Sequence, residues 1–267
     1  MQKNSAANNN HPLVTVIIPA KNEESNIGWV LGRLTSSVDQ VILVDGHSVD
    51  DTINVARSVR PDIEVVVEDR PGKGAALRTG FAAARGDYVV MLDADGSMDP
   101  LEIPLFLQAL RDGWDVVKGS RFLPTGGSTD ISPIRTLGNW ALLKIAERLF
   151  GFRQTDFCYG FIAFQRTALS ALELTATGFE IEAQITVRAH LNGLRVTEVP
   201  SIEAPRRNGQ SQLSPVRDGT RVLLALLRDR IGSRPTGKAR PQAAPNGYRD
   251  AELRPVRSGT PDQHPVR

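Results

Sequence analysis

Two aspartates of the chain stand where a divalent cation could bind. Asp93 and Asp95 directly follow the apolar run 89–92, which is typical of a buried central strand, and Ser97 comes two residues later. In an open α/β sheet, ligands collect at the carboxyl ends of the strands. Mg²⁺ and Mn²⁺ bind carboxylate oxygens and keep positions open for phosphate oxygens. The pattern therefore predicts a metal-bound diphosphate; the alternative is a solvated turn in which Asp99 caps the next helix.

Further acidic residues follow other predicted strands. The segment 19–24 (PAKNEE) follows the predicted strand 13–18, and Asp45 ends the predicted strand 41–44. In a parallel sheet these positions lie at the same edge as Asp93. Carboxylates gathered at one edge repel each other unless a cation or hydrogen-bond donors organise them. Each acid alone is equally explained as a helix cap, but together they favour a ligand site.

Two cationic positions complete the pattern. Lys73 lies between two glycines that open a predicted helix, so backbone N–H groups and an ammonium would face an anion there. Arg121 follows a predicted strand, where a guanidinium could neutralise a departing diphosphate. A flexible surface turn and a surface ion pair are the respective alternatives. No G-x-G-x-x-G follows the first strand, which argues against a dinucleotide-dependent dehydrogenase.

The elements that position these residues alternate between strand and helix, which predicts an α/β fold with a doubly wound, mostly parallel sheet. A long Gly/Pro/Ser/Thr-containing stretch, 122–132, suggests a functional loop, and 206–214 is a second polar loop. The predicted strands are 13–18, 41–44, 63–67, 89–92, 116–117, 161–164 and 194–199, and the predicted helices include 51–59, 72–84, 99–110, 134–150, 180–191 and 217–231.

Composition narrows the class of protein. The 267 residues carry a net charge of +2, but the segment 232–267 alone carries +4 and the remainder −2, which argues against a basic nucleic-acid groove. The single cysteine excludes an intramolecular disulfide, and no apolar run reaches the roughly 20 residues of a membrane span. We expect disordered tails over 1–12 and 232–267 around one domain over 13–231.

In ordered combination, these motifs resemble the family 2 glycosyltransferases of the GT-A fold, and most closely the polyprenyl-phosphate (dolichol-phosphate) mannosyltransferase-like group. The resemblance covers about residues 13–230. Its segments are VIIPAKNEE (16–24), VDGHSVDDT (44–52), GKGAA (72–76), DAD (93–95), GSR (119–121), TDFCYGF (155–161), VP (199–200) and RRNGQSQ (206–212).

The resemblance implies roles for individual residues. The nucleotide-sugar donor would be bound by Pro19, Ala20, Asn22, Glu23, Asp45, Lys73, Asp93, Ala94, Asp95 and Arg121. A Mg²⁺ or Mn²⁺ ion would be held by Asp93 and Asp95, with Ser97 nearby. Phosphates of donor or acceptor would be contacted by Arg121, Arg135, Arg206 and Ser211. The residues expected to act in catalysis are Asp95, Arg121 and Asp156.

The sequence also departs from the family pattern. Lys21 stands where a tyrosine is common, His47 interrupts the commoner Asp-Gly-Ser, Ser97 replaces a commoner glutamine, and Gln212 replaces a phosphate-binding lysine. These positions bear on which sugar and acceptor are used more than on the type of reaction. Family members often carry C-terminal membrane spans, and this sequence shows none.

The expected function is inverting, metal-dependent transfer of a sugar from a nucleoside-diphosphate sugar to a polyprenyl phosphate or related acceptor. GDP-mannose is the favoured donor and UDP-glucose a possible one. A lipid phosphate is already an anionic nucleophile, whereas a hydroxyl acceptor needs a base, for which Asp156 is the candidate. A soluble enzyme acting on a small-molecule hydroxyl, a nucleotidyltransferase and a non-catalytic nucleotide-sugar binding protein remain alternatives.

We expect a cytoplasmic protein, with possible peripheral contact at the inner face of the membrane. The predicted helix 217–231 is dense in leucine and carries arginines on its other face, a composition that suits an anionic lipid surface. An ordinary terminal helix packed on the core explains the same pattern.

Overall fold

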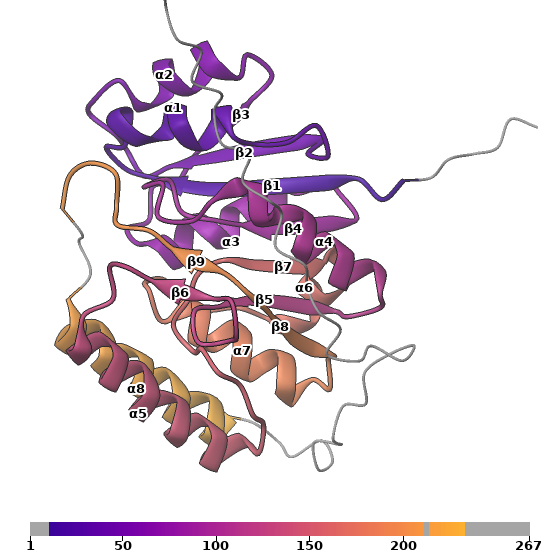
Figure 1. The fold of residues 1–267 in the computed structure, drawn as a ribbon, viewed down its shortest axis with the longest axis vertical. Helices are drawn as coiled ribbons and strands as arrows, with labels where there is room; N and C mark the ends of the chain where they lie inside the picture. The colour runs from indigo at the N-terminus through magenta and orange to yellow at the C-terminus, as the bar shows by residue number, and fades with distance from the viewer. Residues whose placement is uncertain (1–10, 211–213, 233–267) are drawn as a thin grey trace, which may run out of the picture.

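The computed structural model describes residues 11–210 and 214–232, so most of both predicted tails and Ser211 lie outside the described residues. One seven-stranded sheet organises the described chain (Figure 1). Its strands are β1 (Val14–Ala20), β2 (Gln40–Asp45), β3 (Glu64–Val67), β4 (Tyr88–Met91), β5 (Val116–Ser120), β7 (Ile162–Gln165) and β8 (Val196–Pro200). The helices are α1 (Glu24–Gly32), α2 (Thr52–Val59), α3 (Lys73–Ala83), α4 (Ile103–Arg111), α5 (Pro133–Phe150), α6 (Arg166–Leu172), α7 (Ile181–Leu191) and α8 (Pro215–Gly232).

The strand order is β3-β2-β1-β4-β7-β5-β8, and every pair in it is parallel except the two that involve β7. The prediction of an α/β fold with a mostly parallel sheet is confirmed. The connection from β1 leads outward to β2 and β3, and the chain then returns to β4 on the other side of β1. The order of the strands therefore reverses between β1 and β4, which is where open α/β sheets bind ligands.

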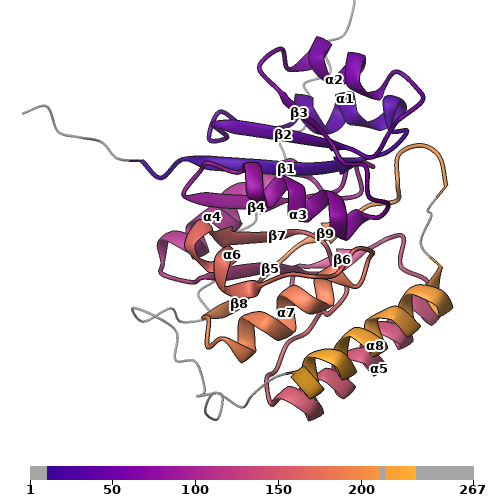
Figure 2. The same cartoon turned by 180° about the vertical axis from the view of Figure 1, so that it is seen from behind.

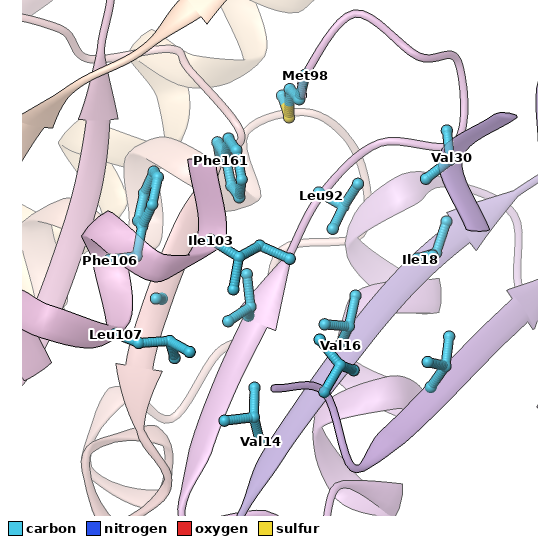
Figure 3. Close-up of a cluster of buried hydrophobic side chains, with 14 of the residues drawn as sticks. Val14, Val16, Ile18, Val30, Leu92, Met98, Ile103, Phe106, Leu107 and Phe161 are labelled. Atoms are coloured by element: carbon cyan, nitrogen blue, oxygen red, sulfur yellow. The ribbon is translucent and has the colours of Figure 1, made fainter. Parts of the chain in front are cut away.

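Helices cover both faces of the sheet because both faces of its central strands are apolar. In β1, Val14, Val16 and Ile18 pack under α1 and α4, as Figure 3 shows, whereas Ile17 points to the opposite face under α3. Side chains alternate along a strand, so a continuous run of β-branched residues serves two layers at once. All of these side chains are at most 2% exposed.

The predicted strands and helices are all present, with bounds that differ by a few residues. Sequence reasoning missed α6, and it missed the two-stranded sheet that β6 (Gly127–Ser128) forms with β9 (Ile202–Glu203). These elements are too short to produce a periodic pattern. The loop predicted over 122–132 is therefore partly held in place by pairing with a distant segment.

The helices α5 and α8 form a separate layer that packs on α7, away from most of the sheet (Figures 1 and 2). Leu143 and Ala146 of α5 meet Val222 and Leu226 of α8, and all four lie against the apolar side of α7. In the described part of the chain, no helix is long and apolar enough to cross a membrane.

A buried lysine fixes the segment that leads into β7. Lys118 of β5 is fully buried, and its Nζ donates to Thr186 Oγ1 (2.8 Å) and to the carbonyl oxygens of Asp156 (3.1 Å) and Phe157 (3.3 Å). Burial lowers the pKa of Lys118 below its ordinary value. These hydrogen bonds tie the 156–157 segment to β5 and to α7, and so determine where Asp156 lies.

His190 of α7 lies in the same interior region. Its ring stacks on Phe152 at a centroid distance of 4.2 Å, and its Nε2 lies 3.3 Å from Gln154 Nε2. Burial, together with the nearby charge of Lys118, lowers the pKa of His190 to about 4. The folded protein therefore holds this imidazole neutral at pH values where the unfolded chain binds a proton.

We predict a stability loss in mild acid that originates at His190. The unfolded imidazole has a pKa near 6.5, so stability decreases as the pH falls from about 6.5 towards 4, by up to about 3 kcal/mol. Urea unfolding of the wild type and of His190→Asn at pH 7 and pH 4.5 measures this, because the variant lacks the titrating group. The matched control is His47→Asn at an exposed position, which should keep the wild-type pH dependence. An equal acid loss in His190→Asn and wild type would contradict the assignment.

Candidate active site

The predicted site residues of β1, β2, β4 and β5 lie at one edge of the sheet. Asp45 is the last residue of β2, Asp93 follows β4 by two residues, and Arg121 follows β5 directly. These strands are mutually parallel, so their carboxyl ends share an edge. The arrangement expected from the sequence is therefore present at the point where the strand order reverses.

Asp93 forms an ion pair with Lys73, which also forms an ion pair with Glu182. Lys73 Nζ, in the first turn of α3, lies 2.5 Å from Asp93 Oδ1 and 2.7 Å from Glu182 Oε1. Burial raises the pKa of Asp93 to about 6, against the opposing charge of Lys73. Burial alone would lower the pKa of Lys73, but the charges of Asp93 and Glu182 outweigh it and raise that pKa. Lys73 thus stays charged between two carboxylates.

Gly160 makes the close approach of this pair possible. A Cβ atom at this position would lie 2.6 Å from Glu182 Oε1 and 2.9 Å from Lys73 Nζ. Glu182 was not predicted as a site residue, because an acid in the first turn of a helix is explained by the helix dipole alone. Only the packing of α7 against α3 shows that it reaches the carboxylate edge.

Asp95 is organised by its own turn and by a distant loop. Ser97 donates to Asp95 Oδ1 from its hydroxyl (2.7 Å) and from its backbone N–H (3.0 Å). Arg206 Nη1 lies 3.4 Å from Asp95 Oδ2, and Arg206 also forms an ion pair with Glu23. The predicted metal and phosphate residues Asp95, Ser97 and Arg206 are therefore neighbours.

The loop that carries Arg206 also lies against the turn at 95–97. The N–H groups of Ala204 and Arg207 donate to the carbonyl oxygens of Ser97 (2.9 Å) and Asp95 (3.1 Å). Gly96 has a φ of +75°, and a Cβ there would come within 2.7 Å of the Arg207 side chain. The Arg207 guanidinium in turn lies 4.6 Å from the ring centroid of Trp29, and these residues border a cavity of about 600 Å³.

A third group of residues joins the ends of β1 and β2. Asn22 donates its N–H to Ser48 Oγ (2.9 Å), and its Oδ1 accepts from the N–H of Val49 (2.9 Å). Asp45 is 2% exposed, and its Oδ2 accepts from the N–H of Ser48 (3.0 Å). Its Oδ1 is buried with no hydrogen-bond partner among the described residues. Such an atom is costly to leave unpaired, which makes Asp45 a candidate to accept a hydrogen bond from a bound ligand or water.

At the β5 end of this edge, Arg121 is enclosed in a buried ion pair with Asp156. Arg121 Nε and Nη2 contact the two carboxylate oxygens of Asp156 at 2.7 and 2.8 Å, and its Nη1 lies 3.1 Å from Glu203 Oε2. The side chains of Arg121 and Asp156 are only 3% and 0% exposed. Arg135 Nη2 lies 3.7 Å from Glu203 Oε1, so the acceptor candidate Arg135 borders this network.

The structure thus separates the predicted residues by environment. Asp93, Asp95, Ser97, Lys73, Glu23 and Arg206 come together, with Asn22 and Asp45 at the adjoining strand ends. Ala94 is 3% exposed and belongs to the core, so its side chain does not serve a ligand. In this conformation Asp156 is closed off from a substrate, and its predicted role as a base has no access route. Glu203, which pairs with both Arg121 and Arg135, had no signal in the sequence, because the short strand that carries it was not predicted.

The residues present fit a divalent cation that shares its ligands with a diphosphate. Asp93 and Asp95 retain 27% and 21% exposure of their side chains, and their oxygens face cationic groups, Lys73 and Arg206. Among the described residues, no cluster of three or more His, Cys, Asp or Glu could hold a metal by itself. Mg²⁺ is commonly bound by one or two carboxylates together with substrate phosphates, which is the kind of site this edge offers.

We predict strong coupling between Arg121 and Asp156. Arg121→Met or Asp156→Leu alone should cost about 3 to 5 kcal/mol of unfolding free energy, because the first leaves Asp156 buried without its partner and the second leaves Arg121 with Glu203 alone. The double variant should recover much of this loss, and a urea-unfolding double-mutant cycle measures the difference. The matched control is the more exposed bidentate pair of Arg195 with Asp115, whose coupling should stay below about 1 kcal/mol. Equal coupling in the two cycles would contradict the buried network.

Comparison with known proteins agrees with this geometry. Residues 15–172 match the family described as Glycosyl transferase family 2. The chain is 32% identical over 213 residues to an undecaprenyl-phosphate mannosyltransferase of Micrococcus luteus, covering 75% of this chain and 87% of that protein. It is 35% identical over 216 residues to a polyprenol monophosphomannose synthase of Mycolicibacterium smegmatis, covering 74% and 80%.

The fold is similar to that of a glucosyl-3-phosphoglycerate synthase from Mycobacterium tuberculosis, crystallised with Mn²⁺, UDP and glucosyl-3-phosphoglycerate. The TM-score is 0.67 at 26% identity, and the match covers 85% of this chain and 82% of that one. The same enzyme has been crystallised with Mg²⁺ and UDP. The GT-A fold is confirmed, and the nucleotidyltransferase and non-catalytic alternatives fall away. The chain belongs to glycosyl transferase family 2, and it is a glycosyltransferase.

Proposed function

We propose that this enzyme transfers a hexose, with inversion and with Mg²⁺ or Mn²⁺, from a nucleoside-diphosphate sugar to a polyprenyl phosphate. GDP-mannose is the favoured donor, because two relatives in sequence are named undecaprenyl-phosphate mannosyltransferase and polyprenol monophosphomannose synthase. UDP-glucose is the second donor to consider, since the similar solved structure holds UDP. The observation that carries the proposal is the pair Asp93 and Asp95 at the reversal of strand order, facing Lys73 and Arg206.

The donor would lie across the carboxyl ends of β1, β2 and β4. The base and ribose would lie against Pro19, Ala20, Asn22 and Glu23 and reach the unpaired Oδ1 of Asp45. Asp93 and Asp95 would hold the metal, which stabilises the negative charge that develops on the departing diphosphate. Ser97 orients Asp95 through two hydrogen bonds. Lys73 supplies a fixed positive charge beside Asp93 and so favours a phosphate there.

The acceptor phosphate would meet cations that come from the other side of the site. Arg206 lies beside Asp95, and Arg135 lies at the start of α5 with 28% of its side chain exposed. Arg121 is closed off by Asp156 and Glu203, so it acts here by positioning the chain around the site. A phosphate monoester is already a nucleophile at neutral pH, and a base is not required. The burial of Asp156 therefore favours a phosphate acceptor over a hydroxyl acceptor.

A small hydroxyl acceptor is the second candidate, favoured by the similarity to glucosyl-3-phosphoglycerate synthase. A base would then be needed, and Glu182 is the carboxylate that reaches the site edge. Glu182 already accepts a hydrogen bond from Lys73 at 2.7 Å, so this carboxylate is engaged in an ion pair and not directed at an acceptor hydroxyl. The lipid-phosphate acceptor therefore has the stronger support.

We predict metal-dependent formation of a mannosyl-phosphoryl lipid. The wild type is incubated with GDP-mannose, a short polyprenyl phosphate and Mg²⁺ or Mn²⁺, and the lipid extract is analysed by mass spectrometry. EDTA should abolish transfer, and Asp95→Asn should reduce it at least about a hundredfold, since the main charge stabilisation is lost. Asp62→Asn at an exposed position away from the site is the matched control and should keep wild-type activity.

A parallel incubation with UDP-glucose and 3-phosphoglycerate distinguishes the two candidates. We expect the rate with this pair to be less than about one hundredth of that with the lipid phosphate, because the acceptor cations suit a phosphate nucleophile and the candidate bases Asp156 and Glu182 are already held in ion pairs. Faster transfer to 3-phosphoglycerate than to the lipid would overturn the proposed acceptor. Persistence of full activity in EDTA would overturn the proposed metal.

A further inference from the structure

The outer surface of the α5–α8 layer is unusually apolar. Fifteen large hydrophobic residues are exposed in the described chain, and eight of them lie on these two helices. On α5 they are Ile134, Leu137, Trp140 and Ile145, and on α8 they are Val216, Leu224, Leu227 and Ile231. We call the surface formed by these eight residues the α5–α8 face. Such clustering on a protein surface marks an interaction site.

These residues are not part of the core stripe of their helices. Leu143, Ala146, Val222 and Leu226 face inward and pack with α7, as the inner side of an amphipathic helix does. A helix on the surface of a soluble domain normally carries polar residues on its remaining side. Here the outer side carries Trp140 at 56% and Ile231 at 86% exposure. Packing of the domain therefore does not explain why the outer positions are apolar.

The exposed charged residues of the two helices are all positively charged. Their exposed charged residues are Lys144, Arg148, Arg217, Arg221, Arg228 and Arg230, all cationic. Their acids are withdrawn: the side chains of Glu147, Asp218 and Asp229 are only 17%, 5% and 8% exposed. The layer thus combines exposed apolar residues with exposed arginines and a lysine. This is the composition of helices that lie in the interface of an anionic bilayer.

The position of the layer connects it to the acceptor side of the site. The helices α5 and α8 lie side by side and run in the same direction, as both views show (Figures 1 and 2). Arg135, in the first turn of α5, is near Glu203 of the buried network, while Ile134 and Leu137 beside it are 68% and 62% exposed. A lipid whose tail lies in a bilayer against this layer would present its phosphate near Arg135.

We propose that the α5–α8 face binds the surface of an anionic phospholipid bilayer, with both helices lying in the interface. The inference deepens the proposed function, because it places a membrane beside the site that would take a lipid phosphate. Association with a second copy of the chain is disfavoured by charge, since two faces with six exposed cations and no exposed acid on their helices would repel each other. An anionic lipid surface neutralises the same charges.

Vesicle binding tests the proposal without donor or acceptor. The full chain is mixed with phosphatidylcholine vesicles that contain 30% phosphatidylglycerol, or none, and bound protein is measured by flotation. We expect binding to the anionic vesicles, and at least about a tenfold weaker partition for Leu137→Gln/Leu224→Gln and for Lys144→Glu/Arg148→Glu, since each removes one of the two contributions. The matched control, Val59→Gln/Arg57→Glu, changes an exposed apolar and an exposed cationic residue on α2 at the opposite end of the molecule and should bind like the wild type.

Tryptophan fluorescence gives a second measurement, which reports on membrane contact in the wild-type protein without substitutions in the face. Trp140 is one of three tryptophans and is 56% exposed. Its emission should shift to shorter wavelength on anionic vesicles and be quenched by brominated lipids, and Trp140→Phe should lose that response. Equal binding of all variants, or no shift of Trp140, would overturn the proposal. So would a dimer in analytical ultracentrifugation that Leu137→Gln/Leu224→Gln converts to monomer, because the face would then bind a second copy.

Activity separates this inference from the proposed function. The face variants should transfer sugar to a short, water-soluble polyprenyl phosphate within about twofold of wild type, but at least about tenfold more slowly to a long-chain acceptor in vesicles. Equal slowing with both acceptors would contradict a membrane role for the face. A different outcome is that neither the wild type nor the variants transfer sugar to either lipid while vesicle binding still follows the expected pattern. In that case the proposed lipid-phosphate acceptor is wrong, but the membrane-binding role of the α5–α8 face is supported.

Discussion

The arrangement of this protein depends on how it neutralises carboxylates that a parallel sheet brings to one edge. The sheet places Asp45, Asp93 and Asp95 at neighbouring strand ends. Negative charges gathered at one edge repel one another and destabilise the fold. Two cationic side chains from other parts of the chain form ion pairs with two of these carboxylates. Lys73 comes from the start of α3 and pairs with Asp93, and Arg206 comes from a loop after β9 and pairs with Asp95. The same positive charges would attract a diphosphate.

A second network of paired charges holds the segments around β5 and β9 in place. Arg121 is enclosed by Asp156 and Glu203, which come from the segment before β7 and from β9. Lys118 holds the same segment through two carbonyl oxygens. Buried charges are tolerated only when geometry supplies partners for all of them, so these residues fix segments that are distant in sequence relative to each other. Arg121 and Asp156, which the sequence suggested as catalytic residues, therefore hold these segments in position.

The α5–α8 layer completes a division of the molecule into three parts. The first strands and their helices form the edge proposed to bind the nucleotide, the turn at 93–97 lies in the middle, and the helix layer lies at the far end (Figure 1). Two apolar clusters lie on opposite faces of the sheet, and a third lies between the helix layer and α7. The helix layer differs because its outward side carries exposed apolar and cationic residues. This is the surface proposed to bind an anionic bilayer.

The sequence by itself determined the fold class, because buried strands and helices of an α/β sheet produce strong periodic patterns over 13–110. It also placed Asp45, Asp93 and Asp95 at one edge, since strand ends of a parallel sheet must coincide. Only the tertiary structure showed that Glu182 pairs with Lys73, that Glu203 pairs with Arg121, and that Asp156 is enclosed. Those pairs join residues 35 to 109 positions apart, and the burial that decides whether a carboxylate can act on a substrate arises from packing, which residue types and spacing do not encode.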